Sequence, residues 1–266
     1  MSNTGLEPIL LVSEARGVTT LRLNRPVRLN TLSEAMLDAL QDALDEVAST
    51  ADARCVVISG AGKAFCAGHD LKEMRGTPDL GYYRALFAQC SKVMQSIAAL
   101  PVPVVARVHG IATAAGCQLV ASCDLAIASR SAKFAVSGIN VGLFCSTPAV
   151  ALSRNVLAKN AFDMLVTGEF VDAETAVRYG LINEAVNDEA LDAAVAAKVE
   201  AILSKDPVSI CYGKHSFNAQ KKMPLAEAYA HSGEVMARNM MELDTCEGID
   251  AFLEKRPSKA GFIRSK

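Results

Sequence analysis

The sequence predicts an α/β fold. Short runs rich in β-branched residues alternate with longer stretches in which apolar residues recur at helical spacing. This alternation is typical of a mostly buried sheet whose strands are joined by crossover helices. No glycine-, serine- or proline-rich linker divides the chain, and its 266 residues suffice for one large domain with a sizeable core.

The first expected elements are a β-hairpin and a helix. Residues 9–13 and 18–23 form the strands of the hairpin, and a turn with glycine at its end joins them over residues 14–17. Residues 31–33 then open an amphipathic helix over residues 35–47. Its apolar face carries Leu37, Leu40, Ala43, Leu44 and Val47 at helical spacing.

Further strands are expected at residues 55–59, 102–108, 125–129 and 181–186, with helical sequence between them. From about Pro207 onward the sequence predicts a helical tail. The tail contains Met223, Met236, Met240 and Met241. Methionine-rich helical surfaces usually fill irregular core or subunit contacts, and we prefer that interpretation to a cofactor site.

Composition excludes several classes of partner. The formal net charge of −2 offers no electrostatic basis for binding nucleic acid or an anionic membrane. The eight cysteines form no Cys-x-x-Cys pair, and only four histidines accompany them, so we expect reduced cysteines and no metal site. No apolar run is long enough to span a bilayer, and the first residues resemble neither a signal peptide nor a transit peptide. We therefore expect a cytoplasmic protein.

The most informative stretch is residues 110–119, which read Gly-Ile-Ala-Thr-Ala-Ala-Gly-Cys-Gln-Leu. It joins the β-branched run at 102–108 to an apolar helical run, which predicts a strand, a tight loop and a helix start. Small residues let a ligand approach the backbone, and the first N–H groups of a helix favour an oxygen that carries negative charge. The alternative is that these residues are small because the helix packs closely on a sheet.

A second corner of the same kind follows the strand at 55–59. Residues 63–72 read Lys-Ala-Phe-Cys-Ala-Gly-His-Asp-Leu-Lys. Two such corners could direct two backbone N–H groups at one point, which is how an oxyanion hole is built for a thioester carbonyl that becomes an enolate.

These two segments resemble the crotonase (enoyl-CoA hydratase/isomerase) superfamily, and the resemblance covers nearly the whole chain. It includes Leu-Asn-Arg-Pro at 23–26, Thr-Gly-Glu at 167–169 and Gly-Leu-Ile at 180–182. The resemblance implies a spiral of repeated β-β-α units over residues 1–206 and a helical region over 207–266 that helps assembly into homotrimers or hexamers. It also implies that the N–H groups of His69 and Ala115 form the oxyanion hole.

The acid/base positions depart from the family. Its hydratases use two glutamates, whose positions here are Gln118 and Gly138. An amide is not a useful base near neutral pH, although Gln118 can still hold a water molecule. General acid–base help is worth roughly 10² to 10⁴ in rate, so hydration by the family route should be largely lost.

The resemblance also implies a CoA-binding set. Basic residues of the family near the CoA phosphates correspond to Arg28 and Lys72, where charge-assisted hydrogen bonds make chemical sense; each could instead be a solvated surface charge. We expect further contacts from residues of the two corners, namely His69, Asp70, Leu71 and Ala115. CoA is part of the substrate, so no separate cofactor is expected.

Several roles stay open. Asp70 is expected to cap the next helix rather than to catalyse, and the His69 ring could serve the substrate or only the fold. The polar residues Ser137, Asn140, Cys145, Ser146 and Thr147 could hold water or a substrate carboxylate, or be loop and cap residues. Three hypotheses follow. They are an acyl-CoA enzyme of this family, a member with altered chemistry such as a decarboxylase or thioester hydrolase, and a non-catalytic acyl-CoA-binding subunit.

Overall fold

The computed structural model describes residues 7–259 and confirms the α/β fold, with two sheets. The larger sheet has the order β1 (Leu10–Ala15), β2 (Val18–Leu23), β3 (Cys55–Gly60), β5 (Val104–Val108), β7 (Leu125–Ser129) and β10 (Glu184–Val186). The smaller sheet has the order β4 (Ala64–Cys66), β6 (Ile111–Thr113), β8 (Lys133–Ala135) and β9 (Val171–Asp172). The pairs β1–β2 and β8–β9 are antiparallel, and all other neighbours are parallel.

The chain winds between the sheets as a spiral of β-β-α units. The first strand of each unit joins the larger sheet and the second joins the smaller one, as β3–β4, β5–β6 and β7–β8 do. The units end in the helices α2 (Leu71–Gly76) and α3 (Leu80–Ala99), then α4 (Ala115–Ser122), then η2 (Ser137–Val141), α5 (Ser146–Asn155) and α6 (Ala158–Thr167). This winding brings the ends of β4 and β6 side by side, each just before a helix.

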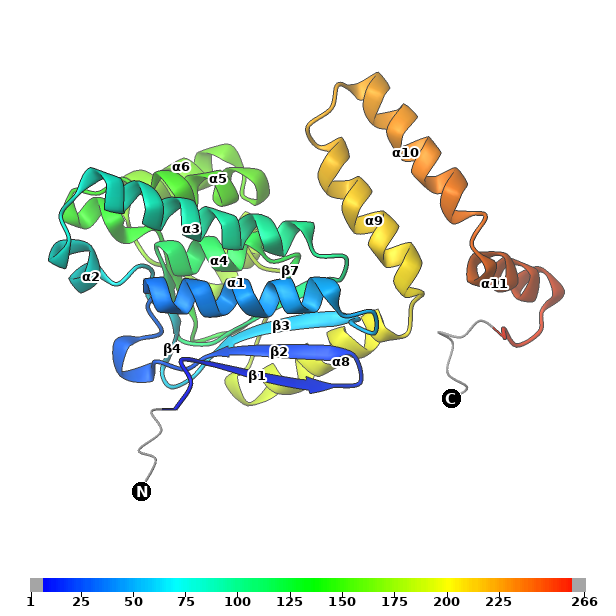
Figure 1. Cartoon of the computed structure of the whole chain (residues 1–266), viewed down its shortest axis with the longest axis horizontal. Helices are drawn as coiled ribbons and strands as arrows, with labels where there is room; N and C mark the ends of the chain where they lie inside the picture. Colours follow the sequence, from blue (N-terminus) through cyan, green and yellow to red (C-terminus); the bar gives the residue numbers. More distant parts are fainter. Residues whose placement is uncertain (1–6, 260–266) are drawn as a thin grey trace.

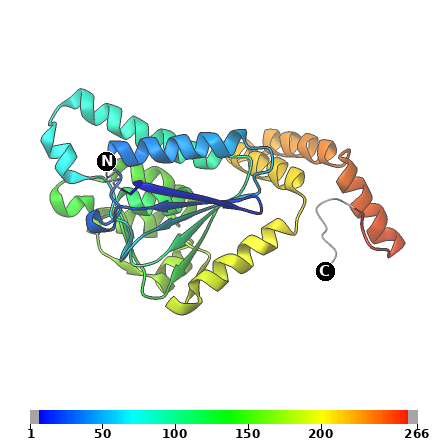
Figure 2. The same cartoon turned by 60° about the horizontal axis from the view of Figure 1, so that its bottom comes forward.

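Helices cover both faces of the larger sheet, as expected for strands that are apolar on both sides (Figure 2). On one face lies α1 (Glu34–Ser49), which begins after Ser33, whose side chain accepts the N–H of Met36. On the other face Val57, Val105 and Ile127 form a cluster with residues of α8 (Leu191–Leu203). Three short elements complete this part of the chain, and they are η1 (Pro26–Arg28), α7 (Ala173–Tyr179) and η3 (Asp188–Ala190).

Three predicted boundaries need correction. The strand expected at residues 102–108 begins only at Val104, after Pro103, which lacks an N–H for the ladder. The strand expected at 181–186 begins only at Glu184, because the N–H of Leu181 bonds back to the Ala176 carbonyl and closes α7 at Gly180. The loop expected before Ala115 contains the short strand β6.

The tail consists of α9 (Pro207–Gln220), α10 (Leu225–Asn239) and α11 (Leu243–Glu254), and α9 begins at the residue that the sequence indicates. Figures 1 and 2 show α10 and α11 extending away from the sheets. The division into residues 1–206 and 207–266 stays a prediction. Residues 1–6, on which the expectation of no leader depends, and residues 260–266 lie outside the described part.

The start of the tail is tied to the end of α3 by side chains of α9. Lys214 is buried, and its ammonium donates to the carbonyls of Ile97 at 2.9 Å and Val102 at 2.8 Å and to the Asp124 carboxylate at 2.7 Å. His215 and Asn218 donate to the next two carbonyls at the end of α3. These bonds satisfy carbonyls that have no partner within α3.

Candidate active site

The two glycine- and alanine-rich corners meet. Gly68, at the end of the first corner, has φ +89°, and a Cβ added to it would lie 2.9 Å from the Ala114 Cβ and 3.2 Å from the Ala115 nitrogen. Only a residue without a side chain allows this approach. The structure therefore brings together the two segments that the sequence marks as a candidate oxyanion site.

The second corner is held in a strained conformation. Ala114 has φ +50° and ψ −120°, a region that residues with a side chain rarely adopt. The next residue, Ala115, begins α4, and a Cβ on Gly116 would lie 2.1 Å from the Cys66 carbonyl oxygen. Residues in such rarely adopted backbone conformations are most often found at functional sites, and each costs ~1–3 kcal/mol of folding free energy. The close fit between β4 and the start of α4 sets the position of the Ala115 N–H.

Two backbone donors at this junction are unused. Within residues 7–259, none of the loop or side-chain hydrogen bonds involves the N–H of His69 or of Ala115. Ala115 is the first residue of α4, whose first-turn N–H groups have no acceptor inside the helix. Neither N–H group therefore has an acceptor among the hydrogen bonds found in the described residues.

Gln118 lies one turn into α4 and is 3 % exposed. Its N–H donates to the Ala114 carbonyl at 3.0 Å, so it follows the strained corner by one helical turn. Its Oε1 atom is buried and has no hydrogen-bond partner within the described residues.

The His69 ring is fixed by two contacts. Its Nδ1 lies 3.3 Å from the Leu32 carbonyl oxygen, and the ring packs in a T-shaped arrangement against the Phe87 ring with 5.5 Å between centroids. Its Nε2 atom is buried and has no partner in the part of the chain that the structure describes. Burial lowers the pKa of His69 below its ordinary value, against the opposite effect of the Leu32 carbonyl.

Asp70, in the first corner, contacts both basic residues of the predicted CoA-binding set. Its Oδ1 accepts the N–H of Lys72 at 2.9 Å, which confirms that it caps α2, and its Oδ2 lies 3.1 Å from the Arg28 guanidinium. Burial by itself raises the pKa of Asp70, but the Lys72 and Glu73 N–H groups and Arg28 outweigh it and hold the pKa below its ordinary value. Leu71 and the Lys72 side chain are exposed beside this cap.

Asn30 supports the first corner, a role that the sequence did not reveal. It is fully buried with φ +55°, and its amide donates to the carbonyls of Ala61 at 2.9 Å and Ala64 at 2.8 Å. Its Oδ1 accepts the Arg25 N–H at 2.9 Å. Residues 24–30 read Asn-Arg-Pro-Val-Arg-Leu-Asn, and the second asparagine is the only local signal. Nothing in this run indicates that the partners of Asn30 lie after β3.

Gly138 has no room for a side chain in this arrangement. A Cβ there would lie 2.5 Å from the Leu143 carbonyl oxygen and 2.7 Å from the Cys145 sulfur. Ser137 shares a 2.8 Å hydrogen bond with Thr113, so this segment is attached to the strand that leads into the second corner.

Two more of the polar residues with open roles donate to nearby backbone carbonyls. The Asn140 amide donates to the Gly168 carbonyl, and the Ser146 hydroxyl donates to the Phe144 carbonyl. These contacts match the alternative in which they are loop and cap residues.

The cysteines are free, and most are buried. Burial raises the pKa of Cys66 and of Cys117, which lie within the two corners, to about 12. Among the described residues, no group of three or more histidine, cysteine or acidic side chains could hold a metal ion. In that same part of the chain no helix is long and apolar enough to cross a membrane.

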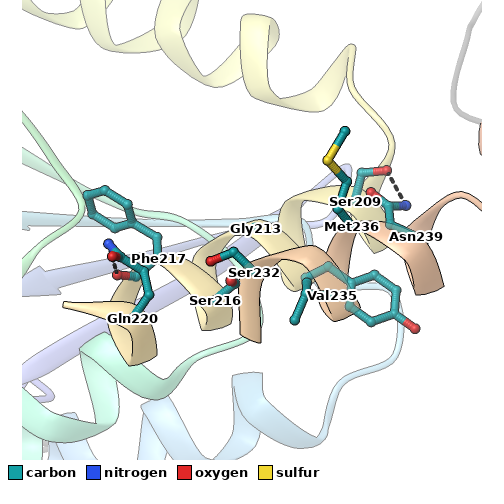
Figure 3. A pocket seen from close by; sticks show the side chains of 10 residues that line it. Ser209, Gly213, Ser216, Phe217, Gln220, Ser232, Val235, Met236 and Asn239 are labelled. Carbon is teal, nitrogen blue, oxygen red and sulfur yellow. Dashed lines mark hydrogen bonds between the residues drawn. The ribbon is translucent and has the colours of Figure 1, made fainter. Parts of the chain in front are cut away.

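A groove of about 390 Å³ lies between α9 and α10 in the tail (Figure 3). Its lining includes Tyr212, Phe217, Val235 and Met236, and a 3.0 Å bond from Asn239 to Ser209 crosses it at one end. None of the residues of the two corners lines this groove.

Comparisons with known proteins point to one family. A family profile described as enoyl-CoA hydratase/isomerase matches residues 13–261. The protein named enoyl-CoA hydratase domain-containing protein 3, mitochondrial, from Rattus norvegicus is 46% identical over 242 residues, which cover 90% of this chain and 80% of that protein. A crystal structure of an enoyl-CoA hydratase from Mycobacterium smegmatis is 57% identical with a TM-score of 0.94, covering 96% of this chain and 99% of that one. The human enoyl Coenzyme A hydratase domain-containing protein 3 is 42% identical with a TM-score of 0.91, covering 94% and 99%.

Proposed function

The chain belongs to the enoyl-CoA hydratase/isomerase family, and on that premise we propose that it binds an acyl-CoA thioester between the two corners. The N–H groups of His69 and Ala115 hold the thioester oxygen and stabilise the enolate that forms from it. One observation carries the proposal. The two corners approach so closely that a Cβ on Gly68, the residue before His69, would lie 3.2 Å from the Ala115 nitrogen.

Backbone donors suit this chemistry because they are rigid. The fit of Gly116 on Cys66 and the hydrogen bonds around Asn30 hold both corners before the substrate arrives, so little reorganisation is needed when charge develops. Removing one donor of this kind typically costs roughly 10² to 10³ in turnover.

For the CoA portion we propose Arg28 and Lys72 as phosphate contacts, with Asp70 and Leu71 beside them. Asp70 holds the Arg28 guanidinium at 3.1 Å, which limits its motion at a half-exposed position where a phosphate can reach it. An arginine fixed in this way loses less side-chain entropy when it binds a phosphate.

The reaction class that we propose is that of a lyase or isomerase acting on an acyl-CoA enolate. Gln118 and Gly138 occupy the positions that we assign to the family glutamates, and neither side chain offers a carboxylate. That absence favours a second candidate, decarboxylation of a malonyl-type thioester, because loss of CO₂ forms the enolate without a strong base.

Calorimetry with crotonyl-CoA, with free CoA as the comparison, tests the binding proposal. Mass spectrometry of the CoA products from crotonyl-CoA and methylmalonyl-CoA then identifies the reaction. We expect Ala115→Val to weaken thioester binding and turnover, because the larger side chain crowds the donor, whereas Ala35→Val on the exposed face of α1 should change neither. Equal binding of crotonyl-CoA by the wild type and Ala115→Val would contradict the assignment.

For assembly we propose a homotrimer, or a hexamer of two trimers, in which the tail contacts other copies. Three large apolar side chains of the tail are each more than two-thirds exposed, which is unusual for their type. They are Met236 on α10, Met241 in the turn after it and Phe252 on α11. Light scattering on the purified chain measures the mass, and a monomeric mass at micromolar concentration would contradict this.

For location we propose the cytoplasm, because free and mostly buried cysteines fit a reducing compartment. The name of the Rattus norvegicus relative includes the word mitochondrial. Cell fractionation decides between the two compartments.

A further inference from the structure

A second groove, of about 300 Å³, lies between α8 and the larger sheet, on the face opposite α1 (Figure 2). On this face α8 packs on β3, β5 and β7. The register pairs Thr20 of β2 with Val57 of β3, so both side chains point to the same face, where Thr20 is only half-buried. The flank of α8 and the uncovered face of β2 form the groove. None of the residues of the two corners lines it.

The groove is narrow and mostly apolar. Val18 and Val57 form its floor, and its wall consists of apolar residues of α8, namely Val195, Ala196 and Val199. A strand rises about 3.3 Å per residue, so the floor from Val18 to Arg22 is roughly 13 Å long. Its volume is at the lower end of the roughly 300–1,000 Å³ that ligand pockets occupy. This shape suits an alkyl chain lying along β2.

An ion pair stands at each end of the groove. At the end near the β1–β2 turn, the Arg16 guanidinium lies 2.8 Å from the Glu200 carboxylate. At the other end, Nε of Arg107 lies 2.5 Å from Oδ1 of Asp192. Each pair is neutral in sum, so neither pair alone selects a charged ligand.

The end at Arg107 carries a further cation, Arg22. The register of β2 and β3 places Arg22 level with Ser59, and the register of β3 and β5 continues this row to Arg107. The hydrogen bond from Arg107 lowers the pKa of Asp192 below its ordinary value, and the charge of Arg22 adds to this effect, so Arg22 acts at the same place. Within residues 7–259 neither the Arg22 guanidinium nor the Ser59 hydroxyl has a hydrogen-bond partner.

We propose that this groove binds an unesterified fatty acid of medium chain length, with its carboxylate on Arg22 and Ser59 and its alkyl chain on the valine floor. Arg22 and Arg107 against Asp192 leave one positive charge uncompensated, which a single carboxylate neutralises. Hydrogen bonds from a guanidinium to a carboxylate are among the stronger ones, and the hydroxyl can add another. This site is separate from the proposed thioester site and does not depend on it.

Calorimetry with octanoate tests the proposal, with crotonyl-CoA present in excess to occupy the corners. We expect octanoate to bind and octylamine, which has the same chain and the opposite charge, not to bind. Arg22→Gln should weaken octanoate binding roughly ten- to a hundredfold, because it removes a charge-assisted hydrogen bond. Arg84→Gln is the matched control, since Arg84 is equally exposed but lies on α3, outside the groove. It should leave the affinity unchanged.

A second variant tests the apolar part of the groove. Ala196 is exposed on α8, so Ala196→Trp can fill the groove without entering the core, and it should abolish octanoate binding. Ala197→Trp, at the next exposed position but outside the lining, should bind octanoate like the wild type.

Three results would overturn the inference. The first is equal binding of octanoate and octylamine, and the second is octanoate binding that neither Arg22→Gln nor Ala196→Trp weakens. The third is a wild type that does not bind octanoate at millimolar concentration. If in that case Ala196→Trp also lowers the native mass measured by light scattering, the groove is covered by a second copy of the chain instead.

Discussion

The nitrogen of Ala115 lies 3.2 Å from the point where a side chain on Gly68 would begin. These residues follow different strands, β4 and β6, which pair in parallel in the smaller sheet. The sheet therefore aligns two corners that lie far apart in the sequence. The site depends on this alignment more than on any one side chain, because the donors that we assign are backbone groups.

Gly68→Ala tests the alignment directly. The substitution places a Cβ 2.9 Å from the Ala114 Cβ at a φ of +89°, so we expect a loss of ~1–3 kcal/mol in the free energy of unfolding. Crotonyl-CoA binding should weaken further than this destabilisation explains, because the corners must separate. Gly76→Ala is the control, since a Cβ there meets nothing within 4 Å. Chemical denaturation and calorimetry measure both effects, and unchanged binding would contradict the prediction.

Asp70→Asn should reduce the acid sensitivity of the fold. The folded-state pKa of Asp70 is below its ordinary value, so its ionised form stabilises the protein above about pH 4, and this contribution is lost as pH falls through the folded-state pKa. Asparagine still caps α2 but cannot pair with Arg28. Unfolding free energies at pH 7 and pH 3 should differ less in the variant, with a loss of ~0.2–1 kcal/mol at pH 7 from the missing ion pair.

The control for this prediction is Asp79→Asn. Asp79 caps α3 through the Tyr82 N–H, and no ion pair of it is found within residues 7–259. It should leave the pH dependence nearly unchanged. An equal effect of the two substitutions would show that the Arg28 contact contributes nothing.

Lys214→Met should loosen the tail from the core. The substitution leaves the Asp124 carboxylate without its cation and two carbonyls without a donor, which typically costs ~3–5 kcal/mol. Hydrogen exchange should speed up in α9 and at the end of α3. Lys222→Met, at an exposed position after α9, is the control, and equal stability of the two variants would contradict the prediction.

Gly138→Ala should destabilise the protein by ~1–3 kcal/mol, because the added Cβ would meet the Leu143 carbonyl oxygen at 2.5 Å. A glutamate at this position would meet the same obstacle, so a carboxylate cannot be restored there without moving the segment after η2. Gly248→Ala in α11, where a Cβ meets nothing within 4 Å, should not destabilise. Thermal unfolding of both variants checks this, and equal midpoints would contradict it.

Much of the fold could be predicted because local signals agree with the final packing. The hairpin, the helix that begins after Ser33 and the strands at residues 55–59 and 125–129 are all present, with boundaries close to those expected. The errors occur where contacts between distant segments determine the local structure. Leu181 looks like strand sequence, but its N–H closes α7 instead, and β4 and β6 are too short for a periodicity to show.

Only part of the candidate site could be predicted from the sequence. The small residues pointed to the corners, and the Asp70 cap follows from its position before a helix. The orientation of the His69 ring could not be predicted, because its Nδ1 lies against the Leu32 carbonyl, which comes from another segment of the chain. The obstruction around Gly138 depends likewise on a carbonyl that folds back over it.

The most direct test of the central claim is isotope-edited infrared spectroscopy of an acyl-CoA labelled with ¹³C at the thioester carbonyl. If the N–H groups of His69 and Ala115 hold that oxygen, the carbonyl stretch shifts to lower frequency on binding to the wild type, and the shift is smaller in Gly68→Ala. A thioester that binds with an unshifted carbonyl stretch would contradict the oxyanion hole, whatever the affinity.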